Sequence, residues 1–153
     1  MKIRGFEVVS KFEGQGINIP VRKTARSAGY DIEAGETVTI PPLTTIVVPT
    51  GLKAYMQEDE VLNLHVRSSI GIKRGLKLAN ITGIIDSDYY NNPDNEGHIM
   101  LALWNPDPSK KVTIEKNECV AQGIFTKFLT TDDDNASGER LGGIGSTTKK
   151  GNM

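Results

Sequence analysis

The apolar positions of this chain fall in short runs, rich in β-branched residues, that glycine, proline and polar residues interrupt. Such runs predict strands at 38–40, 45–48, 61–66, 81–85, 98–104, 112–114 and 120–128. Two of them place a row of apolar side chains on one face, and these rows are Leu62, Leu64 and Val66, and Ile99, Leu101 and Leu103. One short helix is predicted at 70–74. The pattern therefore indicates an all-β fold, a jelly-roll-like β-sandwich or barrel.

The composition changes at Thr130. Of the last 24 residues only four are apolar, while five are glycine. Such a segment buries too little surface to offset the entropy that it loses on ordering. We therefore predict a β jelly-roll domain over 1–129 and a flexible, glycine-rich C-terminal arm over 130–153, which is either disordered or ordered by a ligand or a neighbouring subunit.

Charge and cysteine content narrow the function. The net charge is −1 and the isoelectric point about 6.1, so no general attraction to nucleic acid or to an anionic membrane is expected. A single cysteine, Cys119, excludes an intrachain disulfide framework and a multi-cysteine zinc site. Residues 1–11 lack the apolar core of a signal peptide. We expect a cytoplasmic protein, or one of the host cytoplasm if the chain is viral.

Two segments combine a cation, hydroxyls and free backbone amides, which are the groups that bind phosphate. Arg67-Ser68-Ser69 ends one predicted strand and opens the short helix. In the tail, the glycines of 142–145 can converge on an anion beside Arg140, Ser146 and Thr147. Each segment also has a plainer interpretation: a serine-capped helix beside a solvated arginine for the first, and a linker for the second.

Two single residues also stand out. Asp86 follows the predicted strand 81–85 directly, and a carboxylate fixed at a strand end can orient and deprotonate a water or join a metal site. Aspartates at turns are common, so a structural role stays open. Gln122 is expected to share an apolar strand face with Val120 and Ile124, where its amide needs a partner in the protein or a ligand.

The order of these segments resembles the trimeric dUTPase family, whose five motifs are matched in sequence from Ala28 to Thr147. The matching segments are Ala28-Gly29-Tyr30-Asp31-Ile32, Arg67-Ser68-Ser69, Gly83-Ile84-Ile85-Asp86-Ser87-Asp88-Tyr89, Val120-Ala121-Gln122 and the glycine-rich stretch 140–147. The third match is the most specific. The resemblance implies a jelly-roll homotrimer with active sites where subunits meet, which hydrolyses dUTP to dUMP and pyrophosphate with Mg²⁺.

The resemblance also implies roles for single residues. Asp86 would activate the water that attacks the α-phosphorus. Asp31 would hold Mg²⁺ through water, with the metal chelated mainly by the triphosphate. The other residues of the phosphate side would bind phosphate oxygens, and they are Arg67, Ser68, Ser69, Gln122, Arg140, Gly145, Ser146 and Thr147.

On the nucleoside side, the resemblance implies that Asn80, Gly83 and Met100 contact uracil. Tyr89 would pack under the deoxyribose and leave no room for a 2′-hydroxyl. Ile144 stands where the family usually has an aromatic that stacks over uracil, so an aliphatic lid would replace that stacking.

Three further positions depart from the family pattern. Thr148 replaces a usual glycine, and Cys119 stands where an arginine usually precedes the fourth motif. Residues 90–96 lengthen the connection after Tyr89. Their turn-prone composition suits a longer, solvated hairpin turn, and the alternative is a contact surface for a regulatory protein.

Two other functions fit parts of the same pattern. A dCTP deaminase, possibly bifunctional, would share the fold, but the glycine-rich arm and the segment 83–89 favour the dUTPase. A dUTP-sensing regulatory protein would use the insertion at 90–96 to contact its partner. Analysis of the products formed from dCTP and from dUTP separates these functions.

Overall fold

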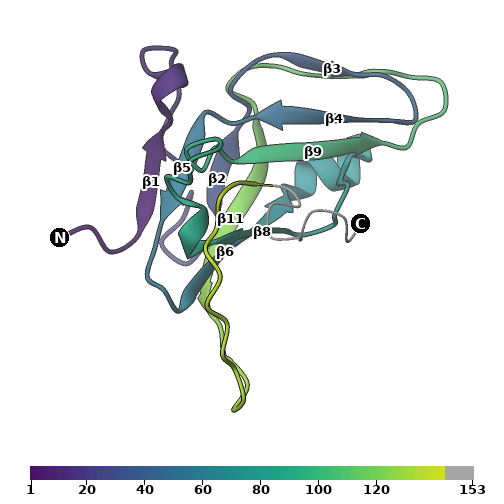
Figure 1. The fold of residues 1–153 in the computed structure, drawn as a ribbon. Coiled ribbons are helices and arrows are strands. Elements are labelled where there is room, and N and C mark those ends of the chain that lie inside the picture. Colours follow the sequence, from purple (N-terminus) through teal and green to yellow (C-terminus); the bar gives the residue numbers. More distant parts are fainter. Residues whose placement is uncertain (144–153) are drawn as a thin grey trace.

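The computed structural model of this chain describes residues 1–143, which form an open β jelly roll with three short helical turns (Figure 1). The turns η1, η2 and η3 span Ser10–Phe12, Ser69–Lys73 and Ser87–Tyr89. The strands are β1 (Gly5–Val8), β2 (Tyr30–Glu33), β3 (Val38–Ile40), β4 (Thr44–Pro49), β5 (Leu52–Tyr55), β6 (Glu60–Val66), β7 (Lys77–Leu78), β8 (Gly83–Asp86), β9 (Met100–Asn105), β10 (Val112–Ile114) and β11 (Cys119–Lys127).

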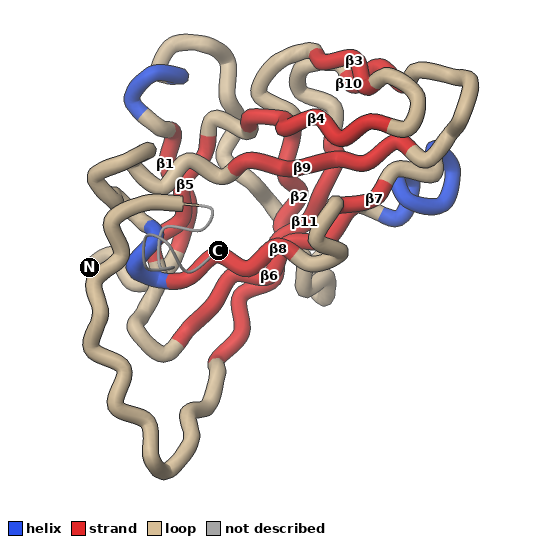
Figure 2. The backbone as a smooth tube through the Cα atoms, turned by 45° about the vertical axis from the view of Figure 1, so that its right-hand side comes forward, coloured by secondary structure: helices blue, strands red, loops and turns tan. Residues whose placement is uncertain are grey.

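The strands pair in antiparallel fashion in two larger sheets and two smaller ones (Figure 2). The larger sheets have the strand orders β2-β11-β6-β8 and β4-β9-β7, and the smaller ones are β1-β5 and β10-β3. Nearly every pairing joins strands that are distant in the chain, as expected for a jelly roll. The predicted all-β class is confirmed, and the described residues form no closed barrel.

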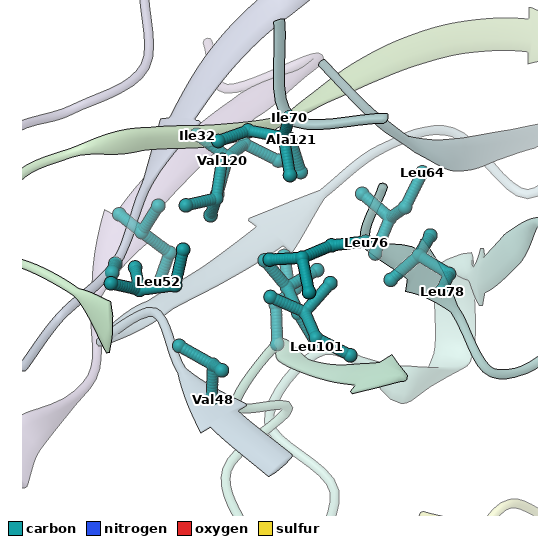
Figure 3. Close-up of a cluster of buried hydrophobic side chains, with 14 of the residues drawn as sticks. Ile32, Val48, Leu52, Leu64, Ile70, Leu76, Leu78, Leu101, Val120 and Ala121 are labelled. Atoms are coloured by element: carbon teal, nitrogen blue, oxygen red, sulfur yellow. The ribbon is translucent and has the colours of Figure 1, made fainter. Parts of the chain in front are cut away.

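One hydrophobic core lies between the two larger sheets (Figure 3). The first sheet contributes Ile32 and Leu64, and the second contributes Val48 and Leu101. All four are at most 2% exposed. Burial of a side chain of this size stabilises the fold by about 1.5–3 kcal/mol, so this layer fixes how the sheets face each other and where their strand ends lie.

The sequence pattern predicted seven of the eleven strands that the structure describes. The strands at 38–40 and 112–114 are confirmed, and the predictions for β4, β6, β8, β9 and β11 differ from the observed bounds only near the ends. The short helix is one turn of π type over Ser69–Lys73. The strands β1, β2, β5 and β7 were not predicted. Each has at most four residues, and none carries the run of β-branched residues from which the equally short β3 and β10 were predicted.

The prediction that Gln122 shares a face with Val120 is wrong. A β-bulge between Cys119 and Ala121 interrupts the pairing of β11 with β2, so Val120 and Ala121 are both fully buried whereas Gln122 is only partly buried. An extra residue in one strand shifts the alternation of its side chains. Gln122 therefore lies on the face that turns away from the core.

The chain after β11 runs away from the sheets and turns back toward them (Figures 1 and 2). Residues 128–143 contain no strand or helix in the part that the structure describes. The division at 129 and the flexibility of the arm stay predictions. Among residues 1–143 no helix has the length and apolar character needed to span a lipid bilayer.

Candidate active site

A cavity of about 530 Å³ lies beside the end of β8 and the start of β9. Six residues singled out from the sequence line it, and they are Asn80, Gly83, Asp86, Tyr89, Met100 and Arg140. They come from segments up to 60 positions apart in the chain. The fold thus brings together the proposed water-activating carboxylate, the residues assigned to uracil and deoxyribose, and the first basic residue of the arm.

Asp86 is the last residue of β8, and its pairing with Val61 of β6 fixes the backbone there. The Arg140 guanidinium donates to Asp86 Oδ2 at 2.7 Å and to Asp88 Oδ1 at 2.7 Å. The Arg140 side chain is only 16% exposed, whereas that of Asp86 is 48% exposed. The arm therefore reaches the cavity of its own chain, and its single guanidinium pairs with Asp86, which lines the cavity, and with the neighbouring Asp88.

Tyr89 is held in the turn that directly follows β8. Its hydroxyl donates to the His98 carbonyl oxygen at 2.6 Å and accepts from Asn95 Nδ2 at 2.8 Å. Burial raises the pKa of the Tyr89 hydroxyl above its ordinary value, and the bond from Asn95 lowers it in part. The phenol is therefore neutral at physiological pH, with its ring fixed against the cavity.

The turn between β7 and β8 presents backbone groups at the cavity. Ile81 has a φ of 67°, a conformation that β-branched residues rarely adopt, and the residue is 71% exposed. The turn is closed by the bond from the Thr82 amide to the Asn80 carbonyl oxygen at 2.7 Å. Backbone strain of this kind concentrates at functional sites, which agrees with the assignment of Asn80 and Gly83 to uracil.

A second polar group lies on β2, β11 and the end of β6, and it does not line the cavity. Gln122 pairs with Asp31 on one side and with His65 on the other. Its amide covers Gly29, where a Cβ atom would stand 2.3 Å from Gln122 Oε1. Only a glycine at position 29 leaves room for the Gln122 amide where it stands. This accounts for the glycine two residues before Asp31 in the first motif.

The charges of this second group are close but not in contact. Arg67 Nε lies 3.8 Å from Asp31 Oδ1, and Lys23 Nζ lies 3.9 Å from Asp31 Oδ2. Asp31 Oδ2 is buried and accepts no hydrogen bond. Buried carboxylate oxygens normally have partners, so this oxygen suits a ligand such as a metal-bound water.

The serines after Arg67 do not behave as helix caps. Ser68 stands at the N-cap position, directly before the helical turn, yet its side chain makes no capping hydrogen bond. The plainer interpretation of this segment, a serine N-cap, is therefore wrong. Ser68 and Ser69 do not line the cavity either, and they lie beside the group formed by Asp31, Arg67 and Gln122 through their place in the chain.

Residues 1–143 contain no cluster of three or more His, Cys, Asp or Glu side chains that could form a metal cage. The donor set at Asp31 fits a different arrangement. Mg²⁺ keeps several of its waters and commonly binds through one or two carboxylates together with substrate phosphates. Asp31 Oδ2 accepts no hydrogen bond, and Lys23 and Arg67 lie on either side of Asp31, where they can bind phosphate. This arrangement matches that requirement.

Sequence reasoning missed two residues of the site. Lys23 comes near Asp31 because an isolated bridge joins Val21 to Asp31, and no sequence pattern marks it. The Asn95 amide donates to the Tyr89 hydroxyl from within the insertion, and the turn-prone composition of that segment gave no sign of this contact. Four predicted site residues, Ile144, Gly145, Ser146 and Thr147, lie outside the described residues.

Comparison with known proteins agrees with the resemblance of the motifs. The dUTPase family model matches residues 15–148. The deoxyuridine 5'-triphosphate nucleotidohydrolase of Lactococcus lactis subsp. lactis is 56% identical over 149 residues, which cover 96% of this chain and 99% of that protein. That of Hahella chejuensis is 34% identical and covers 94% and 95%.

Solved structures agree in fold. The dUTPase of Streptococcus mutans has a TM-score of 0.79 and 46% identity, and the match covers 84% of this chain and 98% of that one. A D95N mutant of the dUTPase from phage phi11 of S. aureus has a TM-score of 0.73 at 20% identity, over 90% and 98%, and shares the fold. The chain therefore belongs to the dUTPase family.

Proposed function

We propose that this chain hydrolyses dUTP to dUMP and pyrophosphate as a Mg²⁺-dependent homotrimer. One observation carries the proposal: in a chain of this family, Asp86 ends a strand at the rim of a cavity that Asn80, Gly83, Tyr89 and Met100 also line. A carboxylate in this place can hold and deprotonate a water next to a bound nucleotide. The expected cytoplasmic location stays a prediction.

In the proposed reaction, Asp86 takes a proton from a water whose oxygen attacks the α-phosphorus. The new bond joins that oxygen to the phosphorus, and the bond to the bridging oxygen of the β-phosphate breaks in line with it. Pyrophosphate leaves with the electron pair of that bond. Phosphoryl transfer of this kind needs positioning and charge neutralisation more than covalent catalysis.

The phosphate-binding side is proposed to come from a second subunit. Arg67, Ser68, Ser69 and Gln122 belong to a surface that does not line the cavity of their own chain, yet the triphosphate must reach both groups. Large apolar side chains remain exposed on the single chain, among them Ile72 at 84% and Ile84 at 62%. Both facts support an assembly in which neighbouring subunits complete each site.

Asp31 is the proposed protein contact of the metal, through the oxygen that accepts no hydrogen bond in the single chain. When bound, Mg²⁺ would neutralise part of the triphosphate charge. Arg67 and Lys23, on either side of Asp31, would bind phosphate oxygens and keep the Asp31 carboxylate in place. Arg140, with the glycine-rich residues that follow it, would close over the phosphates.

The direct test is pyrophosphate release from dUTP and from dATP, dCTP, dGTP and dTTP, with and without Mg²⁺. We expect release from dUTP alone and only with Mg²⁺. Deamination of dCTP would instead support the deaminase alternative, and equal release from all five nucleotides would remove the assigned specificity. Light scattering at micromolar concentration should give three times the mass of one chain, about 50 kDa, and a monomer would contradict shared sites.

A further inference from the structure

The insertion at 90–96 is fastened to the body of the domain. Glu96 accepts hydrogen bonds from the Ser10 amide at 3.1 Å and from Lys53 Nζ at 2.6 Å. Lys53 also donates to Asn91 Oδ1 at 2.6 Å, and its side chain is only 11% exposed. The longer turn is confirmed, and Asn91, Pro93 and Asp94 in it are exposed, but the turn is anchored to the domain and is not wholly solvated. A regulatory partner at this surface stays a prediction.

A buried amide organises the insertion from inside. Asn92 is 5% exposed, and its Oδ1 accepts from the amides of Asp94 at 3.0 Å and Asn95 at 3.1 Å. Its Nδ2 donates to the Tyr89 carbonyl oxygen at 2.7 Å and to Asn95 Oδ1 at 2.8 Å. The turn is thus tied directly to the residue that borders the cavity.

These bonds fix which way the Asn95 amide points. Asn95 Oδ1 accepts from Asn92 Nδ2 and from the Gly97 amide at 3.1 Å, so the oxygen must face the interior of the turn. The Nδ2 group consequently faces the cavity and donates to the Tyr89 hydroxyl at 2.8 Å. The Tyr89 hydroxyl donates its own proton to the His98 carbonyl oxygen. Towards Asn95 it is therefore the acceptor.

The same amide meets the arm. A Cβ atom at Gly143 would stand 3.4 Å from Asn95 Nδ2 and 3.6 Å from the Tyr89 ring. At Gly142 it would stand 3.0 Å from the Asp94 Cβ atom. The glycine pair that follows Arg140 therefore lies directly on the insertion and on Tyr89, at the edge of the cavity.

We propose that Asn95 is a positioning residue for dUTP hydrolysis, which holds the Tyr89 ring at the angle that fits a deoxyribose and forms the seat for the arm at Gly143. The inference rests on the proposed function for its kinetic consequence. Its structural part, an amide that orients a phenol, can be measured without any substrate. The insertion thereby serves the active site of its own chain.

The test compares Asn95→Ala with Pro93→Ala, an exposed position of the same insertion. Asn95→Ala removes three side-chain hydrogen bonds, of which one reaches Tyr89. Loss of that one bond, at about 1.4 kcal/mol, corresponds to a ~10-fold change. We expect Asn95→Ala to lower the ratio of kcat/KM for dUTP over UTP ~10-fold, while Pro93→Ala keeps the wild-type ratio. A purely structural role would lower both substrates equally.

Two further measurements separate the possible failures. On a Tyr89→Phe background, Asn95→Ala should change the ratio by less than ~3-fold, because the hydroxyl that it orients is already gone. The Tyr89 pKa, followed by NMR of 13C-labelled tyrosine, should rise in Asn95→Ala, since the bond that lowers it is lost.

If the wild-type chain does not hydrolyse dUTP, the proposed function is refuted, but the NMR measurement still tests whether Asn95 orients the Tyr89 hydroxyl. An active wild-type chain, with an unchanged dUTP to UTP ratio and an unchanged Tyr89 pKa in a folded Asn95→Ala variant, would overturn the inference. A melting temperature within a few degrees of wild type shows that the variant is folded.

Discussion

The cavity beside β8 and the polar group on β2, β11 and β6 differ in how far one chain completes them. In the cavity, Asp86 and Asp88 are paired with Arg140, and Tyr89 is bonded on both sides. In the polar group, Asp31 Oδ2 is buried and accepts no hydrogen bond. An unsatisfied buried group costs about 1–3 kcal/mol. The fold therefore prepares the proposed nucleoside side in advance and keeps the proposed phosphate side open for a ligand.

The difference has a physical reason. The nucleoside side recognises shape, and a shape can be built from one chain by fixing a strand end, a turn and a ring. The phosphate side must receive several negative charges, and cations that are already satisfied would resist exchange. Arg67 and Lys23 stand 3.8 and 3.9 Å from Asp31, near enough to balance its charge yet free to turn toward phosphate oxygens.

The largest expected effect comes from the cavity side. Asp86→Asn keeps the shape of the carboxylate but cannot take a proton from water, so kcat should fall at least ~10² while dUTP still binds. Single-turnover kinetics with binding measured by calorimetry checks both quantities. Near-normal turnover of this variant would show that Asp86 does not deprotonate the attacking water.

Mixed trimers test whether the two sides belong to different chains. Asp86→Asn and Arg67→Ala subunits should each be nearly inactive alone, and refolding them together should restore activity in about a quarter of the sites, since random mixing places an intact Asp86 beside an intact Arg67 that often. Mixed samples that stay as inactive as the separate ones would mean that both groups act within one chain.

A smaller effect is expected at the open carboxylate. Asp31→Asn removes the charge that the proposed metal contact needs, so the Mg²⁺ concentration for half-maximal activity should rise about 10-fold, the low end for loss of an outer contact of a metal. The same substitution at Asp88, which pairs with Arg140 at the other side of the site, serves as the control. An unchanged Mg²⁺ requirement in Asp31→Asn would contradict the assignment.

The last expected effect is on folding stability and not on activity, and it concerns His98, next to the insertion. Burial, together with the charge of Lys11, lowers the pKa of His98 from 6.5 to about 4, and its Nε2 accepts from the Gly51 amide at 2.9 Å. The unfolded chain binds a proton near pH 6.5 and the folded one does not. His98 therefore stabilises the fold above pH 6.5, and this contribution of about 3 kcal/mol is lost as the pH falls to 4.

Denaturant unfolding between pH 7 and 4 measures that loss. His98→Gln keeps an acceptor for the Gly51 amide but does not titrate, so its stability should fall less steeply with acid than that of the wild type. The same change at the other histidine, His65→Gln, should leave the wild-type slope in place. Equal slopes in the wild type and in His98→Gln would show that other groups govern the acid response.

The parts of the site that depend on the local order of residues were predictable from the sequence. Asp86 follows an apolar run, so a carboxylate at a strand end could be read directly, and the order of five motifs indicated the family. Gln122 was placed on the wrong face, since a bulge is not visible in a pattern of period two. The structure of Asn95 within the insertion was hidden, because turn-forming residues look alike whether solvated or buried.

By itself the sequence determined the all-β class, the core rows of β6 and β9 and the identity of the chemical groups, because strand periodicity and residue chemistry are local properties. Only the tertiary structure decided which of those groups meet. It brought Arg140 to Asp86 and Asn95 to Tyr89, and it set Asp31, Arg67 and Gln122 on another surface. Antiparallel pairing joins strands distant in the chain, and its register depends on how the whole core packs.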